Sequence, residues 1–509
     1  MSNSFLLFRS LVIYGICLPL AIFLGYLLAT PLDIWTLGAV GLVFVFLSVP
    51  LFLRWHYPWL ILCWNLNAVV FFLPGKPQFS LMMIPISISV SILHYILNRK
   101  LKFLQIPSLT RPLCFLTVVV LATALLTGGI GLNAFGGENI GGRRYISLLV
   151  GIAGYFALTS QKIPSQKVHL YVGLYFLSAL TAAISNLAYV INPAFTFIFL
   201  LFPTDAQGIQ ALAQDSIGYT GTYIRWGGLA TASISMIFLM LVKYGVTGIF
   251  DLRKYWRLTL LICLLVITLL GGFRSMLITF LLIFAILFYL EGLMKSPLLP
   301  IFTLVAILGG TLTISMVEKL PLSVQRAFSF LPIKVDPIAE MDAKSSSEWR
   351  LDMWKQVLPE VPRYLLLGKG YSMSASELSM VRSGMTRENA AGAALAGDYH
   401  NGPLSLVMPF GIWGVGGFIW FLVASLRVLH RNYRYGDPAY QRINTFLLAY
   451  FFVKTIIFFV IFGSLYSDMA LFTGAIGLSV AINGGVRSAA PVPVVKQVLN
   501  KFKLAQAAQ

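Results

Sequence analysis

Two arginines and one histidine mark the places in this sequence where phosphate and proton chemistry could occur. Arg225 lies in TGTYIRWGGLA and Arg274 in LLGGFRSMLITF, each where an apolar run begins beside glycines. His400, one of 5 histidines, lies in GDYHNGPLSL just before another apolar run. A guanidinium offers a planar fork of donors that suits phosphate, and an imidazole can accept a proton near neutral pH. The pattern predicts an anion site with a nearby base.

Four further residues are candidates for binding the substrate. Arg350 lies in the amphipathic stretch SSSEWRLDMWKQVLPEVP, and Lys369 lies in the glycine turn LLLGKGYS. Asp398 and Asn401 flank His400, where they could orient its ring. Asp398 could instead be the base itself, and the sequence does not separate the two assignments.

Simpler interpretations stand beside these. Arg225 and Arg274 could extend to lipid headgroups, as long cationic side chains do at membrane surfaces. Arg350 could be a solvated helix residue, and His400 an interfacial histidine without a chemical role. The sequence has no DxD pair in its outward segments and no His/Cys cluster, and its 4 cysteines lie inside apolar runs at no metal-ligand spacing. We therefore expect neither a metal nor another cofactor.

The elements that must position these residues are membrane helices. The chain is 58% hydrophobic and 11% charged, with a mean hydropathy of +0.83. Apolar runs long enough to cross a bilayer of ~30 Å as helices recur along it, and no barrel-like alternation is present. We expect an all-α polytopic bundle of about fourteen spans, near residues 8–29, 33–53, 57–74, 81–97, 113–133, 145–160, 168–191, 226–244, 257–271, 273–292, 297–317, 403–429, 443–463 and 469–484. The first run is expected to be a retained helix, since it lacks a signal-peptide cleavage site.

Basic residues set the expected orientation. With a cytoplasmic N-terminus, the inside connections at 98–112, 160–167, 243–257 and 427–442 and the C-terminal tail are all basic. The outside connections at 30–32, 74–80 and 464–468 together contain one basic residue, Lys76. Contact with anionic membrane lipid accounts for much of the net charge of +19, so a nucleic-acid partner is not expected. Both termini are therefore predicted to be cytoplasmic, with Arg225, Arg274 and His400 on the opposite face.

Two outward segments, near 192–225 and 318–402, are too long for simple turns, and loops of such length usually carry function. In the second, Ser345 and Glu348 match a capping box, and apolar residues follow at helical spacing until Pro359 and Pro362. We expect a helix there and a mobile tract of small residues before His400. Four regions result: N-terminal spans (1–191), spans with outer arginine motifs (192–317), a periplasmic loop (318–402), and C-terminal spans with a basic cytoplasmic tail (403–509).

Four segments in order resemble the O-antigen ligase and O-antigen polymerase superfamily. They are Arg225 to Ala230, Gly271 to Ser275, the loop pattern WRLDMWKQVLPEVPRYLLLGKGYS, and YHNGPLSLVMPFGIWG. The resemblance covers roughly residues 220–420, and the earlier spans match by hydropathy alone. Two departures are Phe273, where a small polar residue often precedes the arginine, and Pro403 after His-Asn-Gly.

The resemblance implies a membrane glycosyltransferase of the GT-C type in the bacterial inner membrane. Its donor would be a glycan on undecaprenyl pyrophosphate, its acceptor a hydroxyl of a glycan, lipid A core or protein, and its reaction periplasmic, metal-independent and inverting. Arg225 and Arg274 would hold the pyrophosphate and His400 would act at the acceptor, with Arg350 as a further candidate. Ligase, polymerase and protein O-glycosylating transferase remain open. The rival class is a non-enzymatic transporter or flippase of lipid-linked sugars, which would favour internal repeats and charges near the midplane.

Overall fold

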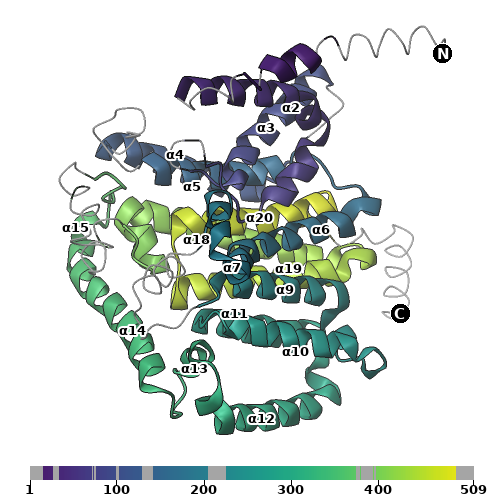
Figure 1. The fold of residues 1–509 in the computed structure, drawn as a ribbon, viewed down its shortest axis with the longest axis vertical. Coiled ribbons are helices and arrows are strands. Elements are labelled where there is room, and N and C mark those ends of the chain that lie inside the picture. Colours follow the sequence, from purple (N-terminus) through teal and green to yellow (C-terminus); the bar gives the residue numbers. More distant parts are fainter. Residues whose placement is uncertain are drawn as a thin grey trace, which may run out of the picture.

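In the part of the chain that the computed structural model describes, the regular secondary-structure elements are helices (Figure 1). Those residues are 15, 17–23, 25–26, 34–71, 73, 76–98, 103–128, 142–204, 225–373, 379, 394 and 397–488. Within them the only β-type pairing is an isolated bridge between Val69 and Gln78. This agrees with the expected all-α class.

Sixteen α-helices have defined bounds in these residues. In chain order they are α2 (Ile34–Cys63), α3 (Phe79–Leu97), α4 (Pro107–Thr127), α5 (Gly142–Leu158), α6 (Val168–Leu177), α7 (Ala182–Ile191), α9 (Gly227–Ile249), α10 (Trp256–Leu269), α11 (Arg274–Leu290), α12 (Leu298–Met316), α13 (Leu322–Phe328), α14 (Pro337–Val357), α15 (Val361–Tyr364), α18 (Gly402–Tyr435), α19 (Gln441–Ile456) and α20 (Leu465–Asn483). Most expected spans from 81–97 onward coincide with one of these helices or with a helix pair.

Eight helical segments among the described residues are long and apolar enough to cross a membrane. The apolar helices α10 and α11 are shorter, and the expected span at 8–29 lies largely outside the described residues. The chain is therefore a multi-pass membrane protein, and the count of about fourteen spans stays a prediction.

The expected span at 57–74 is not a separate helix. Residues 34–63 form one helix that kinks at Trp55, and the residues described after it, 64–71, 73 and 76–78, are not helical. Two amides in this stretch bond to the neighbouring helices: Asn65 Nδ2 donates to the carbonyl of Tyr175, and the backbone N–H of Asn67 donates to Thr181 Oγ1. Hydropathy measures only apolar content. It therefore does not predict that the polar groups of this segment form hydrogen bonds with other helices while the segment itself is not helical.

The centre of the bundle is built on close packing of α20 against α5, with α18 against α4 beside them (Figure 1). Glycines permit the close approach. A Cβ added at Gly151 would lie 3.2 Å from the backbone nitrogen of Ala470, and one added at Gly477 would lie 3.0 Å from Leu158. Small residues at such contacts let helix backbones approach within a membrane, where packing and not hydrophobicity drives association.

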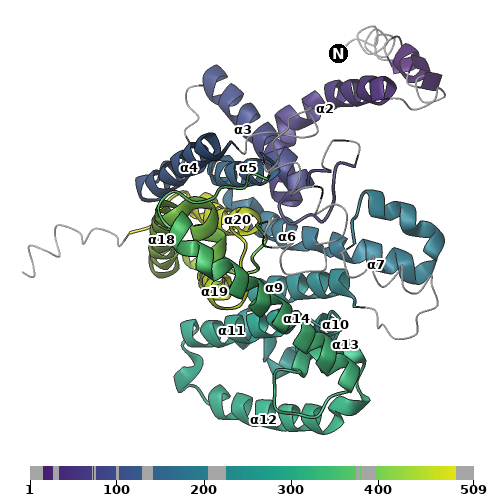
Figure 2. The same cartoon turned by 90° about the vertical axis from the view of Figure 1, so that its left-hand side faces the viewer.

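The long segment after α12 is structured by α13, α14 and α15. Figure 1 shows α14 along the side of the molecule where α11 begins, and Figure 2 looks onto that side. The predicted helix is present, but its predicted start is wrong. It begins at Pro337 with Asp336 as N-cap, whose Oδ1 accepts a hydrogen bond of 2.8 Å from the N–H of Ile338. Ser345 and Glu348 therefore lie inside the helix and form no capping box.

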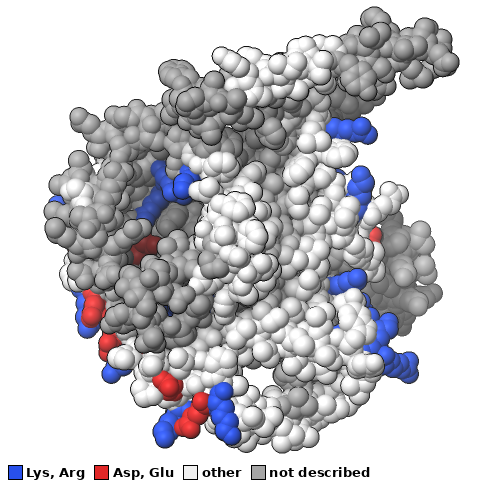
Figure 3. All heavy atoms as spheres, viewed as in Figure 1, with Lys and Arg blue, Asp and Glu red and all other residues white. Residues whose placement is uncertain are grey.

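Charge is unevenly distributed on the face in Figure 3. One edge carries Lys and Arg with little acidic charge, whereas the edge along α13 and α14 mixes both signs. The ion pairs of this second edge include Lys344 with Glu348 and Lys355 with Asp352. A helical loop with mixed charge therefore lies at the opposite end from the basic connections.

Candidate functional site

The turn between α10 and α11 brings Arg225 and Arg274 together. Arg225 comes just before α9, is 7% exposed, and donates from Nε to the carbonyl of Gly271 at 3.2 Å. Its guanidinium carbon lies 4.4 Å from the ring centre of Phe273, the residue directly before Arg274. Phe273, which departs from the expected pattern, thus provides a cation–π surface for Arg225.

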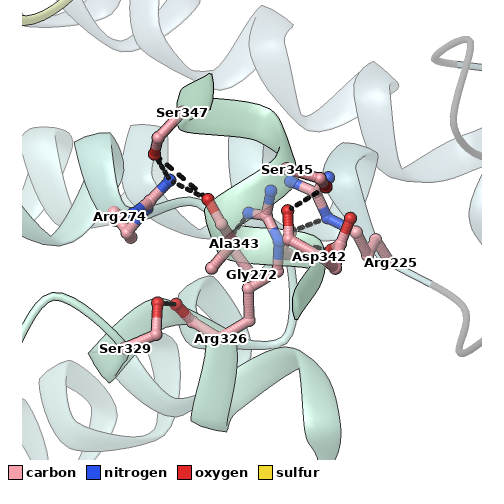
Figure 4. Close-up of polar contacts among 10 residues, drawn as sticks. Arg225, Gly272, Arg274, Arg326, Ser329, Asp342, Ala343, Ser345 and Ser347 are labelled. Atoms are coloured by element: carbon pink, nitrogen blue, oxygen red, sulfur yellow. Dashed lines mark hydrogen bonds and ion pairs between the residues drawn. The ribbon is translucent and has the colours of Figure 1, made fainter. Parts of the chain in front are cut away.

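Arg274 joins this turn to the loop helix. It is the first residue of α11, and its Nη2 donates to the carbonyl of Ala343 and to Ser347 Oγ on α14, both at 3.1 Å (Figure 4). An arginine at the start of an apolar helix has therefore turned toward protein groups, which disfavours the headgroup interpretation. The contact also fixes the depth at which α14 crosses the helix ends.

Arg326 on α13 completes the cluster and was not singled out from the sequence. It is 5% exposed, donates from Nη1 to the carbonyl of Gly272 at 2.7 Å, and forms an ion pair through Nε with Asp342 on α14 (Figure 4). Its one sequence signal is an arginine in the apolar stretch LSVQRAF, where no acidic residue lies one helical turn away. Its contacts are all with distant segments, so local patterns do not predict them.

Arg350, also on α14, lies close enough to sense the other guanidinium groups. Burial lowers the pKa of Arg350 from its ordinary value, and the charges of Arg274 and Arg326 lower it further. The Arg350 guanidinium carbon is 6.0 Å from the ring centre of Phe462, which precedes α20. Arg350 is therefore a half-buried member of the cluster and not a freely solvated helix residue.

Arg274, Arg326 and Arg350 share a single carboxylate partner within the part of the chain that the structure describes. Among the described residues, Asp342 is the only carboxylate that forms an ion pair with Arg274, Arg326 or Arg350. Like charges held together in a partly dehydrated site cost free energy that an anion would offset. The cluster is thus arranged for a ligand with more than one negative charge.

His400 shares an aromatic contact with this cluster. Its ring centre lies 5.1 Å from that of Phe462, the ring beneath Arg350, and 5.2 Å from that of Trp349 on α14. Its backbone is in the left-handed region, with φ of 47°, which is uncommon for a residue other than glycine. Such strain persists where surrounding contacts fix the backbone and is frequent at functional sites.

The electrostatics of His400 keep its ring neutral. Burial lowers the pKa of His400 below its ordinary value, Asp398 opposes this shift, and the charge of Arg350 adds to it. His400 Nε2 is 3.9 Å from Asp398 Oδ2, too long for a hydrogen bond, and Nδ1 is buried with no hydrogen-bond partner among the described residues. A neutral imidazole with an unused nitrogen can accept a proton at neutral pH.

The residues after His400 form the start of α18, and this accounts for Asn401, Gly402 and Pro403 in the motif. Asn401 is the N-cap of α18, and its Oδ1 accepts a 3.0 Å hydrogen bond from the N–H of Leu404. Gly402 is needed because a Cβ there would lie 2.1 Å from the carbonyl oxygen of Phe458. Pro403 is in the first turn, where its missing N–H costs nothing. Asn401 is thus occupied in capping, and its expected role toward substrate stays a prediction.

Lys369 lies apart from the arginines. Its backbone N–H donates to the carbonyl of Met408 at 2.6 Å, and that of Gly370 donates to Pro409 at 3.0 Å. Both acceptors precede the kink of α18 at Gly411, so the glycine turn satisfies carbonyls that the kink leaves free. Within the described residues no hydrogen bond or ion pair joins the Lys369 side chain to the cluster, and its expected role in substrate binding also stays a prediction.

A cavity of about 430 Å³ borders the arginine turn. It is lined by amides and hydroxyls as well as apolar groups, among them Asn65, Asn67, Gln78 and Thr231, and it reaches Phe273. Because Phe273 also carries Arg225, the cavity opens directly beside the anion site. A mixed polar lining of this kind suits hydroxyl-bearing groups.

Comparison with known proteins identifies a related family. Residues 258–419 match the protein-family model described as O-Antigen ligase. That segment contains Arg274, Arg326, Arg350 and His400, whereas Arg225 precedes it. No curated protein and no solved structure matches the chain.

Proposed function

Through residues 258–419 this chain is a member of the O-antigen ligase and polymerase superfamily, and from that membership we propose that it is a glycosyltransferase of surface-polysaccharide assembly. It takes a glycan from undecaprenyl pyrophosphate and transfers it to a hydroxyl acceptor at the periplasmic face of the inner membrane. We also propose that the fold is of the GT-C type. The observation that carries the proposal is the shared contact of Arg350 and His400 with Phe462, which puts an anion site next to a base.

The arginines would act on the leaving group. When the bond between the sugar and the pyrophosphate breaks, an electron pair moves onto the leaving oxygen and negative charge develops there. Hydrogen bonds already hold Arg274 and Arg326 in place, so their charge requires no reorganisation at that moment, and Arg350 adds a third positive charge nearby. Arg225 lies on the side of the polar cavity, where it would contact the diphosphate and the first sugar.

His400 would act on the acceptor. The acceptor oxygen attacks the anomeric carbon, the carbon–oxygen bond to the diphosphate breaks, and the hydroxyl proton passes to His400. The lowered pKa of His400 leaves its ring unprotonated near pH 7, as a base requires. Direct attack of this kind would invert the anomeric configuration, as the family resemblance implies.

The structured loop favours an enzyme over a transporter. Arg274 and Arg326 fasten α14 across the helix ends, and both Trp349 and Arg350 come from α14. Charge is thus gathered at one end of the bundle under a helix, which suits a reaction site better than a path through the membrane. Because α14 provides residues of the site and also covers the site, its position would determine which acceptors fit.

The decisive experiment supplies the purified full chain with a lipid-linked glycan of defined structure and separate candidate acceptors. We expect a new glycosidic bond and release of undecaprenyl pyrophosphate, both lost in His400→Ala. Longer lipid-linked chains identify a polymerase, glycan on lipid A core identifies a ligase, and glycan on protein identifies a protein-glycosylating enzyme. Movement of labelled donor across vesicle membranes without bond formation would instead establish the flippase class. Nuclear magnetic resonance of the product linkage tests inversion.

A further inference from the structure

A second cationic group lies at the other end of the turn that carries His400. Arg144, in the first turn of α5, places its guanidinium carbon 4.7 Å from the ring centre of Tyr466 and 5.5 Å from that of Tyr371. A Cβ added at Gly397 would lie 2.8 Å from Arg144 Nη1, so the guanidinium directly abuts the backbone that leads into Asp398 and His400. Arg144 thus lies at the start of this turn and Arg350 near its end.

The surroundings of Arg144 are rigid. The hydroxyl of Tyr145 accepts a hydrogen bond of 2.8 Å from the backbone N–H of Tyr371. Gly370 lies so close to α4 and α5 that a Cβ there would be 2.3 Å from Thr127 Oγ1. The N-terminus of α5 and the glycine turn are therefore packed against each other beside the guanidinium.

Two polar groups in this place form no hydrogen bond with the residues that the structure describes. Among the described residues Arg144 forms no hydrogen bond and no ion pair, although its charge is only partly exposed. The side chain of Tyr371 is 5% exposed, and its hydroxyl is buried without a hydrogen-bond partner among the same residues. Burial raises the pKa of Tyr371 while the charge of Arg144 acts against that rise, so the phenol and the guanidinium are close neighbours. Unpaired buried donors of this kind are costly unless a ligand satisfies them.

We propose that Arg144, Tyr371 and Tyr466 form an acceptor subsite that binds an anionic sugar, one whose ring carries a carboxylate or a phosphate. The guanidinium pairs with the oxyanion, the partly exposed ring of Tyr466 contacts the sugar ring, and the turn from Gly397 to His400 brings the base to a neighbouring hydroxyl. The assignment to the acceptor rests on the proposed transfer function. The donor diphosphate belongs to the arginines around α14, at the other end of the turn.

A binding measurement tests the subsite without requiring turnover. The full chain in detergent is titrated with a galacturonic acid tetrasaccharide and with maltotetraose, a neutral sugar of equal length. We expect the acidic sugar to bind about ten-fold more tightly or better, the worth of one charged hydrogen bond, and Arg144→Ala to abolish this preference. Arg143→Ala is the matched control, because Arg143 is the preceding residue and is exposed, and it should retain the preference. A tetrasaccharide with a phosphate in place of the carboxylates distinguishes the two oxyanions.

Two further arms separate this site from the donor site. Arg274→Ala should keep the preference for the acidic sugar, whereas inhibition of transfer by undecaprenyl pyrophosphate should weaken in Arg274→Ala and stay unchanged in Arg144→Ala. Arg144→Lys, which retains charge without the planar fork, guards against a folding defect and should show an intermediate preference. Equal binding of both sugars by the wild type, or a preference that survives Arg144→Ala, would overturn the subsite. A protein that prefers the acidic sugar but transfers no glycan would instead overturn the proposed function alone.

Discussion

Arg274 donates to the carbonyl of Ala343 across the junction between an apolar helix and the loop helix. The bond places the start of α11 against the middle of α14, and the same guanidinium also reaches Ser347. An arginine that would bind the donor therefore also determines where α14 lies. Donor binding at Arg274 would therefore be coupled to the position of α14 through one side chain.

Arg274→Ala should reduce glycan transfer by about 10² to 10³, the usual effect of losing one fixed donor at developing charge. Arg274→Lys should recover only part of this loss, because a compact ammonium cannot present two parallel donors to a diphosphate as the planar guanidinium does. Transfer to a defined acceptor measures both. Arg363→Ala, on α15 beside Tyr364, is the control and should transfer normally. Wild-type rates in Arg274→Ala would remove the residue from the site.

Asp342→Ala should destabilise the protein, because it leaves the nearly buried Arg326 without its ion-pair partner. Asp342 itself is partly exposed, so we expect a cost on the order of 1 to 3 kcal/mol and not the larger cost of a fully buried pair. Thermal unfolding in detergent measures it. Lys355→Ala breaks an exposed pair with Asp352 and should change stability by less than about 0.5 kcal/mol. Equal melting temperatures for the two variants would contradict this account.

The pH profile of transfer should report His400. Its pKa is lowered, so kcat/KM should be full at pH 7 and fall as the pH drops through a midpoint below the ordinary value of about 6.5. Stability follows the same sign, since a depressed pKa favours the folded state above the unfolded pKa and this contribution is lost as the pH falls.

Two neighbours should move that midpoint in opposite directions. Arg350→Met removes a charge that lowers the pKa of His400, so the midpoint should rise, whereas Asp398→Asn removes one that raises it, so the midpoint should fall. The second variant also decides which group is the base. If Asp398→Asn abolished transfer at every pH while His400→Gln remained active, Asp398 would be the base.

The sequence predicted the parts of this site that local composition marks. Glycines beside Arg225 and Arg274 and the pair His400-Asn401 at a helix start stand out in an apolar chain, and the structure brings Arg225 to Arg274 and His400 to Arg350. Most helix positions also followed from hydropathy, because backbone groups in a membrane leave few alternatives to a helix.

Neither Arg326 nor Arg144 was predicted as a site residue from the sequence, and the reason is the same for both. Their partners, Gly272 and Asp342 in one case and Tyr371 and Tyr466 in the other, are distant in the chain. Such contacts depend on how the loop helices pack against the bundle, which the spacing of residues in the sequence does not predict.

The start of α14 was mispredicted although its signal was present. Asp336 followed by Pro337, with Glu340 in the first turn, is a stronger helix start than the pattern around Ser345. This helix start was not predicted from the sequence, because the apolar residues at helical spacing occur only later in the helix.

Gly402→Ala should test how tightly the start of α18 holds His400. The added Cβ would lie 2.1 Å from the carbonyl of Phe458 and 2.6 Å from its ring, so the helix start must move. Overpacking of this kind costs about 1 to 3 kcal/mol, and a shift of about 1 Å in a catalytic group can lower the rate by 10². We expect an inserted protein with strongly reduced transfer and an altered pH midpoint.

Gly416→Ala is the matched control for Gly402→Ala, because Gly416 lies on the same helix with nothing within 4 Å of its added Cβ. There the substitution should be neutral or stabilise the helix by up to about 1 kcal/mol, with transfer unchanged. Melting temperature and initial transfer rate of both variants make the comparison. If Gly402→Ala transferred as fast as Gly416→Ala, the left-handed turn at His400 would not depend on the close contact with Phe458, and the position of the imidazole would have to be set by Trp349 and α14 alone.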